Sequence, residues 1–292
     1  MTKNPPKFAD QFDAVKYKQT TLDQWNSAAE AWHRWSPLLS RWLGPATETM
    51  LDMSQLEKGH RVLYVAAGAG EQTLTIAKRV GVSGHVLATD ISPNILEYTR
   101  TSANLAGLQN IHTQVIDGEN LTILDAAPFD AVISRVGLIY FPDQQKALTG
   151  MKYHLRSDGN VAAMVYSSAE KNPFFSIPVS IIRRRANLPA PLVGQPGPFS
   201  LGTKDKLQQV FSNAGFRNVE VEAIDAPVRV SSAAECLQFE QESFGALHQM
   251  LCGLSDREKD DAWIEIEQAL EQFEVNGQFE GPCEMLVAIG TK

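Results

Sequence analysis

A run of small residues, followed at intervals by acidic residues, is the part of this sequence best suited to hold a ligand. Residues 62–70 read VLYVAAGAG, an apolar stretch of strand length that passes into a turn containing Ala66, Gly68 and Gly70. Small side chains let the backbone of such a turn approach a ligand closely, and the free N–H groups of a following helix favour negative charge. The pattern predicts a strand–turn–helix ligand site.

Acidic residues follow this turn at positions that read as strand ends. Asp90 lies about twenty residues further on, where a carboxylate can accept hydrogen bonds from both hydroxyls of a ribose. Asp117 can accept from an adenine amino group, and the N–H of Gly118 can reach a ring nitrogen. Ser134 and Arg135 end a further apolar stretch. Because parallel strands present their carboxyl ends at one edge of a sheet, these residues predict a nucleoside-type ligand there.

Apolar runs of strand length alternate with helical patterns in the middle of the chain. The expected strands are residues 62–66, 85–89, 111–116, 129–134 and 160–166. The helices expected among them are residues 71–80, 92–105 and 144–155. Alternation at this spacing predicts βαβ units, a mostly parallel sheet and helices on both faces of it.

Helical patterns precede this core. Residues 3–18 read as irregular, whereas a stripe of tryptophan and alanine predicts a helix over residues 21–35. A second helix is expected to start at Ser36–Pro37 and to break at Gly44–Pro45. A third is expected to run from there to about residue 56.

The last part of the chain departs from the alternating pattern. Helices are expected over residues 172–185, 203–214, 233–251 and 255–273, a Pro/Gly-rich loop over 190–202, and strands over 218–230 and 284–291. The two strands suit a terminal antiparallel hairpin that the helices of 233–273 interrupt. Residues 172–202 and 233–273 are therefore expected to form a lid over the strand ends.

Composition narrows the classes of partner. Lys and Arg number 26 against 34 Asp and Glu, a net charge of -8, which disfavours a nucleic-acid partner because phosphate backbones need a positive face. No apolar run approaches the roughly 20 residues of a membrane-spanning helix, and residues 1–6 do not resemble a secretory signal. Three scattered cysteines without a CxxC pair predict a reducing compartment and no zinc site. We expect a cytoplasmic protein.

Residues 58–166 resemble the class I S-adenosylmethionine-dependent methyltransferases, in particular the branch of ubiquinone/menaquinone and other small-molecule methyltransferases. The matching stretches are VLYVAAGAG at 62–70, ATDIS at 88–92, DGENL at 117–121, FDAVISRVGLIYFPD at 129–143 and AGFRNVEV at 214–221. The resemblance implies a doubly wound, Rossmann-like α/β fold with seven strands, the last one antiparallel. It also implies S-adenosylmethionine as cofactor. The expected division is an N-terminal helical cap (1–57), a cofactor-binding core (58–168), and the rest of the sheet with the inserted lid (169–292).

The resemblance assigns roles by position. The implied cofactor residues are Ala66, Gly68, Gly70, Asp90, Ile91, Asp117, Gly118, Ser134 and Arg135. In the family, the turn after the first strand cradles the methionine part, and the acid after the second strand holds the ribose, with Ile91 against the adenine. The acid–glycine pair after the third strand reads the adenine edge. The backbone that ends the fourth strand borders the amino-acid part and the acceptor.

Two positions depart from the family. It usually has an acid where this chain has Tyr64 and a glycine where it has Ala66. The missing acid removes one counter-charge for the amino group of the cofactor. An alanine is expected to tolerate this turn only if its φ angle stays negative.

No residue stands out as catalytic. A sulfonium donor is already activated, so the protein must mainly orient the reactants and exclude water. A base is needed where the acceptor loses a proton, and His33 is the best-placed histidine. It lies within an aromatic stripe of Trp25, Trp32 and Trp35. This stripe either packs in the protein core or stabilises a cation such as the sulfonium. No spacing of His, Asp and Glu predicts a metal site.

The sequence thus predicts methyl transfer to a small, largely apolar organic acceptor, because the flanking segments are rich in phenylalanine and leucine. One alternative keeps the cofactor but uses it in a cyclisation or rearrangement. Another is a nicotinamide-dependent oxidoreductase, although no tyrosine here has a lysine four residues on. A binding protein with a decayed site and a protein methyltransferase also stay open, as does a homodimer.

Overall fold

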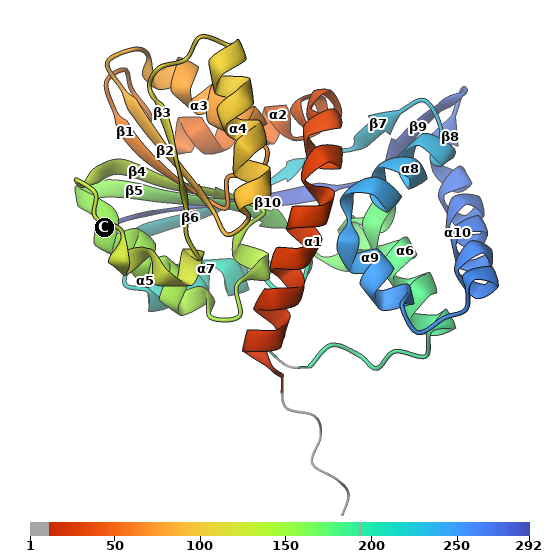
Figure 1. Cartoon of the computed structure of the whole chain (residues 1–292). Helices are drawn as coiled ribbons and strands as arrows, with labels where there is room; N and C mark the ends of the chain where they lie inside the picture. The colour runs from red at the N-terminus through yellow and green to blue at the C-terminus, as the bar shows by residue number, and fades with distance from the viewer. Residues whose placement is uncertain (1–11, 193) are drawn as a thin grey trace, which may run out of the picture.

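A seven-stranded sheet forms the centre of the computed structural model, which describes residues 12–192 and 194–292 (Figure 1). The strand order is β3–β2–β1–β4–β5–β10–β6. The strands are β1 (Arg61–Val65), β2 (His85–Asp90), β3 (Ile111–Val115), β4 (Phe129–Arg135), β5 (Leu155–Tyr166), β6 (Arg217–Asp225) and β10 (Glu284–Thr291). Strands β1 to β5 pair in parallel, and β10 lies antiparallel between β5 and β6. The predicted seven-stranded sheet with an antiparallel last strand is confirmed.

Helices cover both faces of this sheet, as right-handed crossovers require. They are α2 (Ser36–Met53), α3 (Glu71–Val80), α4 (Pro93–Leu105), α5 (Gln144–His154) and α7 (Lys204–Asn213), with short 3-10 helices η1 (Gly118–Ile123), η2 (Leu138–Tyr140), η3 (Ala169–Lys171) and η4 (Glu271–Phe273). Because helices cover both faces, β1 and β4 are buried along almost their whole length. The chain reverses its strand order between β1 and β4, which is where open α/β sheets bind ligands.

The segment before the sheet forms two helices rather than the expected three. Helix α1 (Ala14–Arg34) begins seven residues before the expected start at residue 21, because the side chain of Asp13 accepts hydrogen bonds from the N–H groups of Val15 and Lys16. The prediction of an irregular segment over residues 3–18 is therefore wrong for residues 14–18. Residues 3–11 lie outside the described residues.

Pro45 does not break α2, contrary to expectation. Proline inside a helix costs about 3 kcal/mol, since it removes one hydrogen bond and crowds the preceding turn. Apolar side chains on both sides of Pro45 offset that cost, each by about 1.5–3 kcal/mol on full burial. The buried ones include Trp42, Leu43, Met50 and Leu51, all at most 3% exposed. Tertiary burial here overrides the local signal.

The strand expected over residues 218–230 splits into two elements. Strand β6 ends at Asp225, and β7 (Val228–Val230) belongs to a separate three-stranded sheet with β8 (Glu274–Val275) and β9 (Gln278–Gly281). Pro227, without an N–H, lies between the two strands. The β8–β9 hairpin turns at Asn276–Gly277, both with positive φ, a pair typical of tight hairpin turns that the sequence analysis did not use.

Four helices lie together beside the sheet: α6 (Pro173–Arg185), α8 (Ala233–Ser243), α9 (Gly245–Leu251) and α10 (Asp256–Leu270). Figure 1 shows α1 running between this helical group and the sheet, and α1 packs against α4 as well as α8 and α9. The expected division of the chain into cap, core and inserted lid stays a prediction. Within the described residues, no helix is long and apolar enough to cross a membrane.

Candidate functional site

A cavity opens at the carboxyl ends of β1 to β4. It encloses about 1140 Å³ of space outside the atoms when its open mouth is included. The predicted cofactor residues that line it are Ala66, Gly68, Gly70, Asp90, Ile91, Asp117, Gly118 and Arg135. The structure thus brings together residues from four strand ends.

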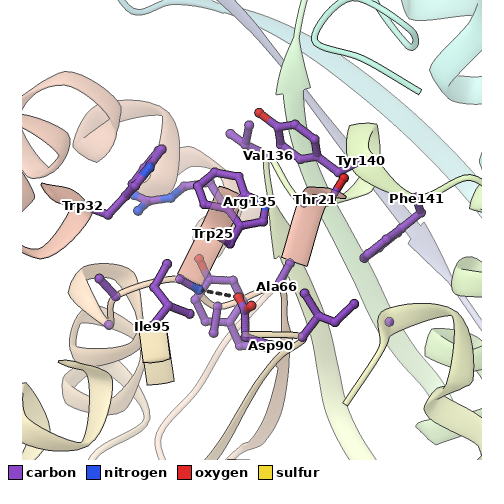
Figure 2. Close-up of a pocket in the computed structure, with 18 of the residues that line it drawn as sticks. Thr21, Trp25, Trp32, Ala66, Asp90, Ile95, Arg135, Val136, Tyr140 and Phe141 are labelled. Atoms are coloured by element: carbon purple, nitrogen blue, oxygen red, sulfur yellow. Dashed lines mark hydrogen bonds between the residues drawn. The ribbon is translucent and has the colours of Figure 1, made fainter. Parts of the chain in front are cut away.

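The turn after β1 is fixed from two sides. The carboxylate of Asp90 accepts hydrogen bonds from the N–H of Gly68 at 3.0 Å and from the N–H of Ser92 at 3.0 Å. Figure 2 marks one hydrogen bond at Asp90 with a dashed line. The hydroxyl of Thr99 donates to the carbonyl of Gly68 at 2.8 Å. Burial raises the pKa of Asp90, while the surrounding N–H groups act to lower it. Gly70 has φ 101°, and a side chain there would collide with the backbone of Thr99. The turn is therefore rigid, small and close to an acid.

Ala66 adopts φ 56°, so the negative φ that was expected to be necessary for an alanine in this turn is not present. The left-handed region costs a residue with a side chain about 1–2 kcal/mol. Gly137 allows this conformation, because a Cβ at that position would lie 2.4 Å from the Cβ of Ala66. Ala66 thus adopts a conformation typical of glycine, with its methyl group against Gly137, which lies between β4 and η2.

Lys18 of α1 reaches the acid at the end of β3. Its Nζ lies 2.7 Å from Oδ2 of Asp117 and 2.6 Å from Oε2 of Glu119. Burial acts to lower the pKa of Lys18, but the hydrogen bonds and charges of the two carboxylates outweigh it and raise the pKa. The sequence analysis missed Lys18, since it placed this residue in an irregular segment. An adenine amino group at Asp117 would share the carboxylate with this lysine.

Gly118 provides space in the same region. A Cβ there would lie 2.5 Å from the ring of Phe141, which lines the cavity as well. Ile91 also lines the cavity, directly after Asp90. Phe141 and Ile91 both give apolar surface to the cavity, which suits the predicted adenine position.

Arg135 and Ser134, at the end of β4, have different surroundings. Arg135 is 8% exposed, and its Nη2 lies 2.7 Å from Oε2 of Glu71, the first residue of α3. Its Nη1 donates to the hydroxyl of Thr47 at 3.1 Å. Ser134 is fully buried and does not line the cavity, and its hydroxyl has no hydrogen-bond partner among the described residues. The sequence analysis missed Glu71, although it follows Gly70 directly.

Tyr64 lies beneath the turn, where the family usually has an acid. Its hydroxyl donates to Oε1 of Gln72 at 2.8 Å, and the ring is 1% exposed. Burial raises the pKa of Tyr64 strongly, and the nearby charge of Arg135 acts in the opposite direction. Tyr64 is therefore neutral and supplies no charge to a ligand in the cavity.

Aromatic side chains form the wall opposite the strand ends. Trp25 packs edge-on against Trp32 at 5.4 Å and against Tyr140 at 5.5 Å between ring centroids. Figure 2 shows these residues on one side of Ala66 and Asp90, with Phe141 on another side. Trp35 of the same stripe does not line the cavity, and its indole donates to Glu242 at 2.6 Å. Two of the three tryptophans thus face the cavity.

Histidines lie away from this cavity. His33 stacks on Tyr98 at 4.8 Å between ring centroids, and no histidine lines the cavity within the described part of the chain. The position of His33 contradicts its candidacy as a general base. In residues 12–192 and 194–292, no group of three or more His, Cys, Asp and Glu side chains is arranged to hold a metal ion.

Comparisons with known proteins agree on one domain type. A family model described as a methyltransferase domain matches residues 62–159, the stretch from β1 into β5. The chain is 33% identical over 128 residues to the ubiquinone/menaquinone biosynthesis C-methyltransferase UbiE of Pasteurella multocida, covering 44% of this chain and 47% of that protein. It is 30% identical over 146 residues to the aklanonic acid methyltransferase DauC of Streptomyces sp., covering 50% and 64%. The chain thus spans about half to two thirds of the length of these relatives.

Solved structures share the fold at low sequence identity. A putative methyltransferase from Bacillus halodurans superimposes with a TM-score of 0.56 at 18% identity, over 84% of this chain and 98% of that one. The [4+2]-cyclase SpnF superimposes with a TM-score of 0.52 at 14% identity, over 92% and 97%. At these identities the superpositions establish the fold and leave the reaction to be argued from the cavity.

Proposed function

We propose that this chain, which belongs to the class I S-adenosylmethionine-dependent methyltransferases, transfers the methyl group of S-adenosylmethionine to a small, largely apolar organic acceptor. The observation that carries the proposal is the continuity of one cavity. At one side it is lined by the turn of Gly68 and by Asp90 and Asp117, and at the other by an aromatic wall that includes Trp25 and Tyr140. A nucleoside cofactor and an apolar acceptor would then meet in one space.

The residues of the cavity fit this cofactor. Asp90 has a buried carboxylate beside the turn, in reach of ribose hydroxyls, and Gly68 lines the cavity with open space where a side chain would lie. Asp117 and Gly118 offer an acceptor and an N–H to the adenine edge. Bound S-adenosylmethionine supplies an electrophilic methyl group, so the protein need not activate the donor.

The remaining task of the protein is orientation and exclusion of water. Helix α1 places Trp25 and Trp32 over the cavity, and Phe244, at the junction of α8 and α9, adds a further apolar side chain. These groups, together with Leu39 and Leu43 of α2, favour an apolar acceptor that is held by shape. We propose that α6, α8, α9 and α10 act as the lid that determines which acceptor enters.

Replacement of Asp90 tests the cofactor site. We expect the wild-type protein to bind S-adenosylmethionine and S-adenosylhomocysteine in calorimetric titrations. We expect Asp90→Ala to weaken both by roughly 10- to 150-fold, since hydrogen bonds to a charged group contribute about 1.5–3 kcal/mol. Asp125→Ala is the matched control, because Asp125 is an exposed carboxylate outside the cavity. Thermal melts of both variants check that the fold persists.

Two outcomes would contradict the proposal. Wild-type protein that binds neither compound would exclude the cofactor. A mass-spectrometric assay would test methyl transfer with ubiquinone and menaquinone precursors and aklanonic acid, the compounds that the relatives' names indicate. If the protein binds S-adenosylmethionine but forms no S-adenosylhomocysteine in this assay, the result would favour the cyclisation or rearrangement alternative. A methylated product with an equal amount of S-adenosylhomocysteine would support methyl transfer and identify an acceptor.

A further inference from the structure

A buried ion pair between Arg135 and Glu71 lies at the β4 side of the cavity. Nη2 of Arg135 and Oε2 of Glu71 are 2.7 Å apart, and the two side chains are 8% and 13% exposed. Both residues line the cavity. Glu71 directly follows Gly70, so its carboxylate is tied to the turn that approaches the ligand. Arg135 is held in addition by Thr47 of α2 at 3.1 Å.

The pair leaves one acceptor free. Oε2 of Glu71 meets the guanidinium, whereas no hydrogen bond among the described residues uses Oε1. Removing two charges from water costs several kcal/mol per ion, and mutual attraction recovers this only with further hydrogen bonds. A ligand that adds such hydrogen bonds would complete the pair. Tyr64 cannot replace Glu71 in this role, because its hydroxyl is neutral and donates to Gln72.

The other charged side chains of the cavity belong to the proposed nucleoside site at the ends of β2 and β3. In the described part of the chain, the charged residues that line it are Lys18, Glu71, Asp90, Asp117 and Arg135. Lys18 and Asp117 pair with each other at the end of β3. The two oxygens of Asp90 accept from backbone N–H groups of Gly68 and Ser92. Beside the turn, Glu71 and Arg135 present an anion and a cation next to each other.

The amino-acid end of S-adenosylmethionine has the complementary charges, an ammonium and a carboxylate on one carbon. A guanidinium binds a carboxylate through paired N–H donors, and a carboxylate with a free oxygen accepts from an ammonium. We propose that Glu71 binds the ammonium and Arg135 binds the carboxylate of the cofactor, so that this ion pair recognises its amino-acid end. The inference rests on the proposed cofactor. Glu71 on α3 would then supply the negative charge for the cofactor's ammonium that an acid on β1 usually supplies in the family.

The test compares ligands with and without the charged end. Calorimetric titrations use S-adenosylhomocysteine and methylthioadenosine, which lacks the amino acid, with wild-type protein and Glu71→Gln. We expect Glu71→Gln to weaken the binding of S-adenosylhomocysteine by about tenfold or more, because one charge-assisted hydrogen bond is lost. The affinity for methylthioadenosine should stay within about twofold of the wild-type value. Asp90→Ala, in contrast, should weaken both ligands. Equal effects of Glu71→Gln on both ligands, or no effect on either, would overturn the inference.

Ligand analogues keep the test decisive if Glu71→Gln does not fold. Wild-type protein is titrated with analogues of S-adenosylhomocysteine that lack only the amino group or only the carboxylate. Each analogue should bind about tenfold or more weakly than the parent compound. Arg135→Lys should weaken the binding of the parent compound more than the binding of the analogue without the carboxylate. Analogues that bind as tightly as the parent would refute the ion-pair site. Wild-type protein that binds no nucleoside at all would instead refute the proposed function.

Discussion

Ala66 adopts a backbone conformation that glycine reaches at lower cost. Its φ of 56° lies in the left-handed region, and the absence of a side chain at Gly137 leaves room for its methyl group. The two positions are coupled, because a Cβ at 137 would lie 2.4 Å from the Cβ of Ala66. An alanine at 66 is thus compatible with the turn while one at 137 is not.

Ala66→Gly should stabilise the protein. Glycine removes the strain of the left-handed alanine, which stabilises the folded protein by about 1–2 kcal/mol. The greater freedom of glycine in the unfolded chain lowers the stability by about 0.5–1 kcal/mol. We expect a net gain of about 0.5–1 kcal/mol in the free energy of unfolding, measured by urea denaturation. Gly137→Ala should destabilise, since it brings two methyl groups into collision. A loss of stability in Ala66→Gly would show that the methyl group contributes packing that outweighs the strain.

Glu240 of α8 is a buried acid without a partner. The residue is fully buried, and neither carboxylate oxygen has a hydrogen-bond partner among the described residues. Burial raises the pKa of Glu240 well above its ordinary value of 4.5. The carboxyl group is therefore protonated in the folded protein at pH values where it is ionised in the unfolded chain.

This difference makes stability fall as pH rises. From about pH 4.5 up to the raised pKa, the unfolded chain binds one proton fewer than the folded protein, so the free energy of unfolding drops by up to about 1.4 kcal/mol per pH unit. We expect Glu240→Gln to remove this slope and to be more stable than wild type at pH 7 but not at pH 4.5. Glu57→Gln, at an exposed position, is the control in denaturation series across this range. Parallel pH profiles for wild type and Glu240→Gln would contradict the assignment.

Helix α1 is attached over the cavity by polar contacts at separate points. Lys18 pairs with Asp117 and Glu119, and the hydroxyl of Ser92, at the start of α4, donates to Oδ1 of Asn26 at 2.6 Å. Between them, Trp25 contributes to the aromatic wall. Because these contacts join α1 to both the β2 and the β3 ends, the helix closes the side of the cavity where the nucleoside is proposed to lie.

Lys18→Met should loosen α1 without unfolding the sheet. Lys18 is 27% exposed, so its two ion pairs are partly screened, yet they fix the first half of the helix to the strand ends. We expect faster amide hydrogen exchange in residues 14–26 and unchanged exchange in β1 and β4. Lys16→Met is the matched control, because Lys16 is exposed on the same helix and forms no ion pair among the described residues. Equal exchange in the two variants would mean that aromatic packing alone holds α1.

At the scale of the whole molecule, the cavity combines residues from inside and outside the range that the methyltransferase domain model matches. That match covers residues 62–159, whereas Phe244 comes from the segment between α8 and α9. The proposed cofactor site thus lies mainly in the matched range, and the proposed acceptor site draws on α1, α2 and Phe244. The expectations of a homodimer, a cytoplasmic location and no nucleic-acid partner stay predictions.

Local patterns in the sequence were enough to predict the core of the fold. Alternating apolar runs and helix signals predicted α3 to its bounds and β1 to β4 to within one residue at each end, since each signal there is local: a glycine that ends a helix, a serine cap, a run of buried strand length. Strand β5, in contrast, begins five residues before its expected start at residue 160. The same patterns placed Asp90 and Asp117 at strand ends, and the parallel sheet brought them to one edge.

The other features of the fold and of the cavity could not be predicted, because they depend on contacts between residues that are distant in the sequence. Burial of Trp42 and Leu43 carried α2 through Pro45, and packing against Gly137 allowed Ala66 its positive φ. The pairing of Lys18 with Asp117 spans 99 residues and that of Glu71 with Arg135 spans 64. No local sequence pattern predicts such pairs. The arrangement of charged side chains in the cavity and the orientation of its walls therefore follow only from the folded structure.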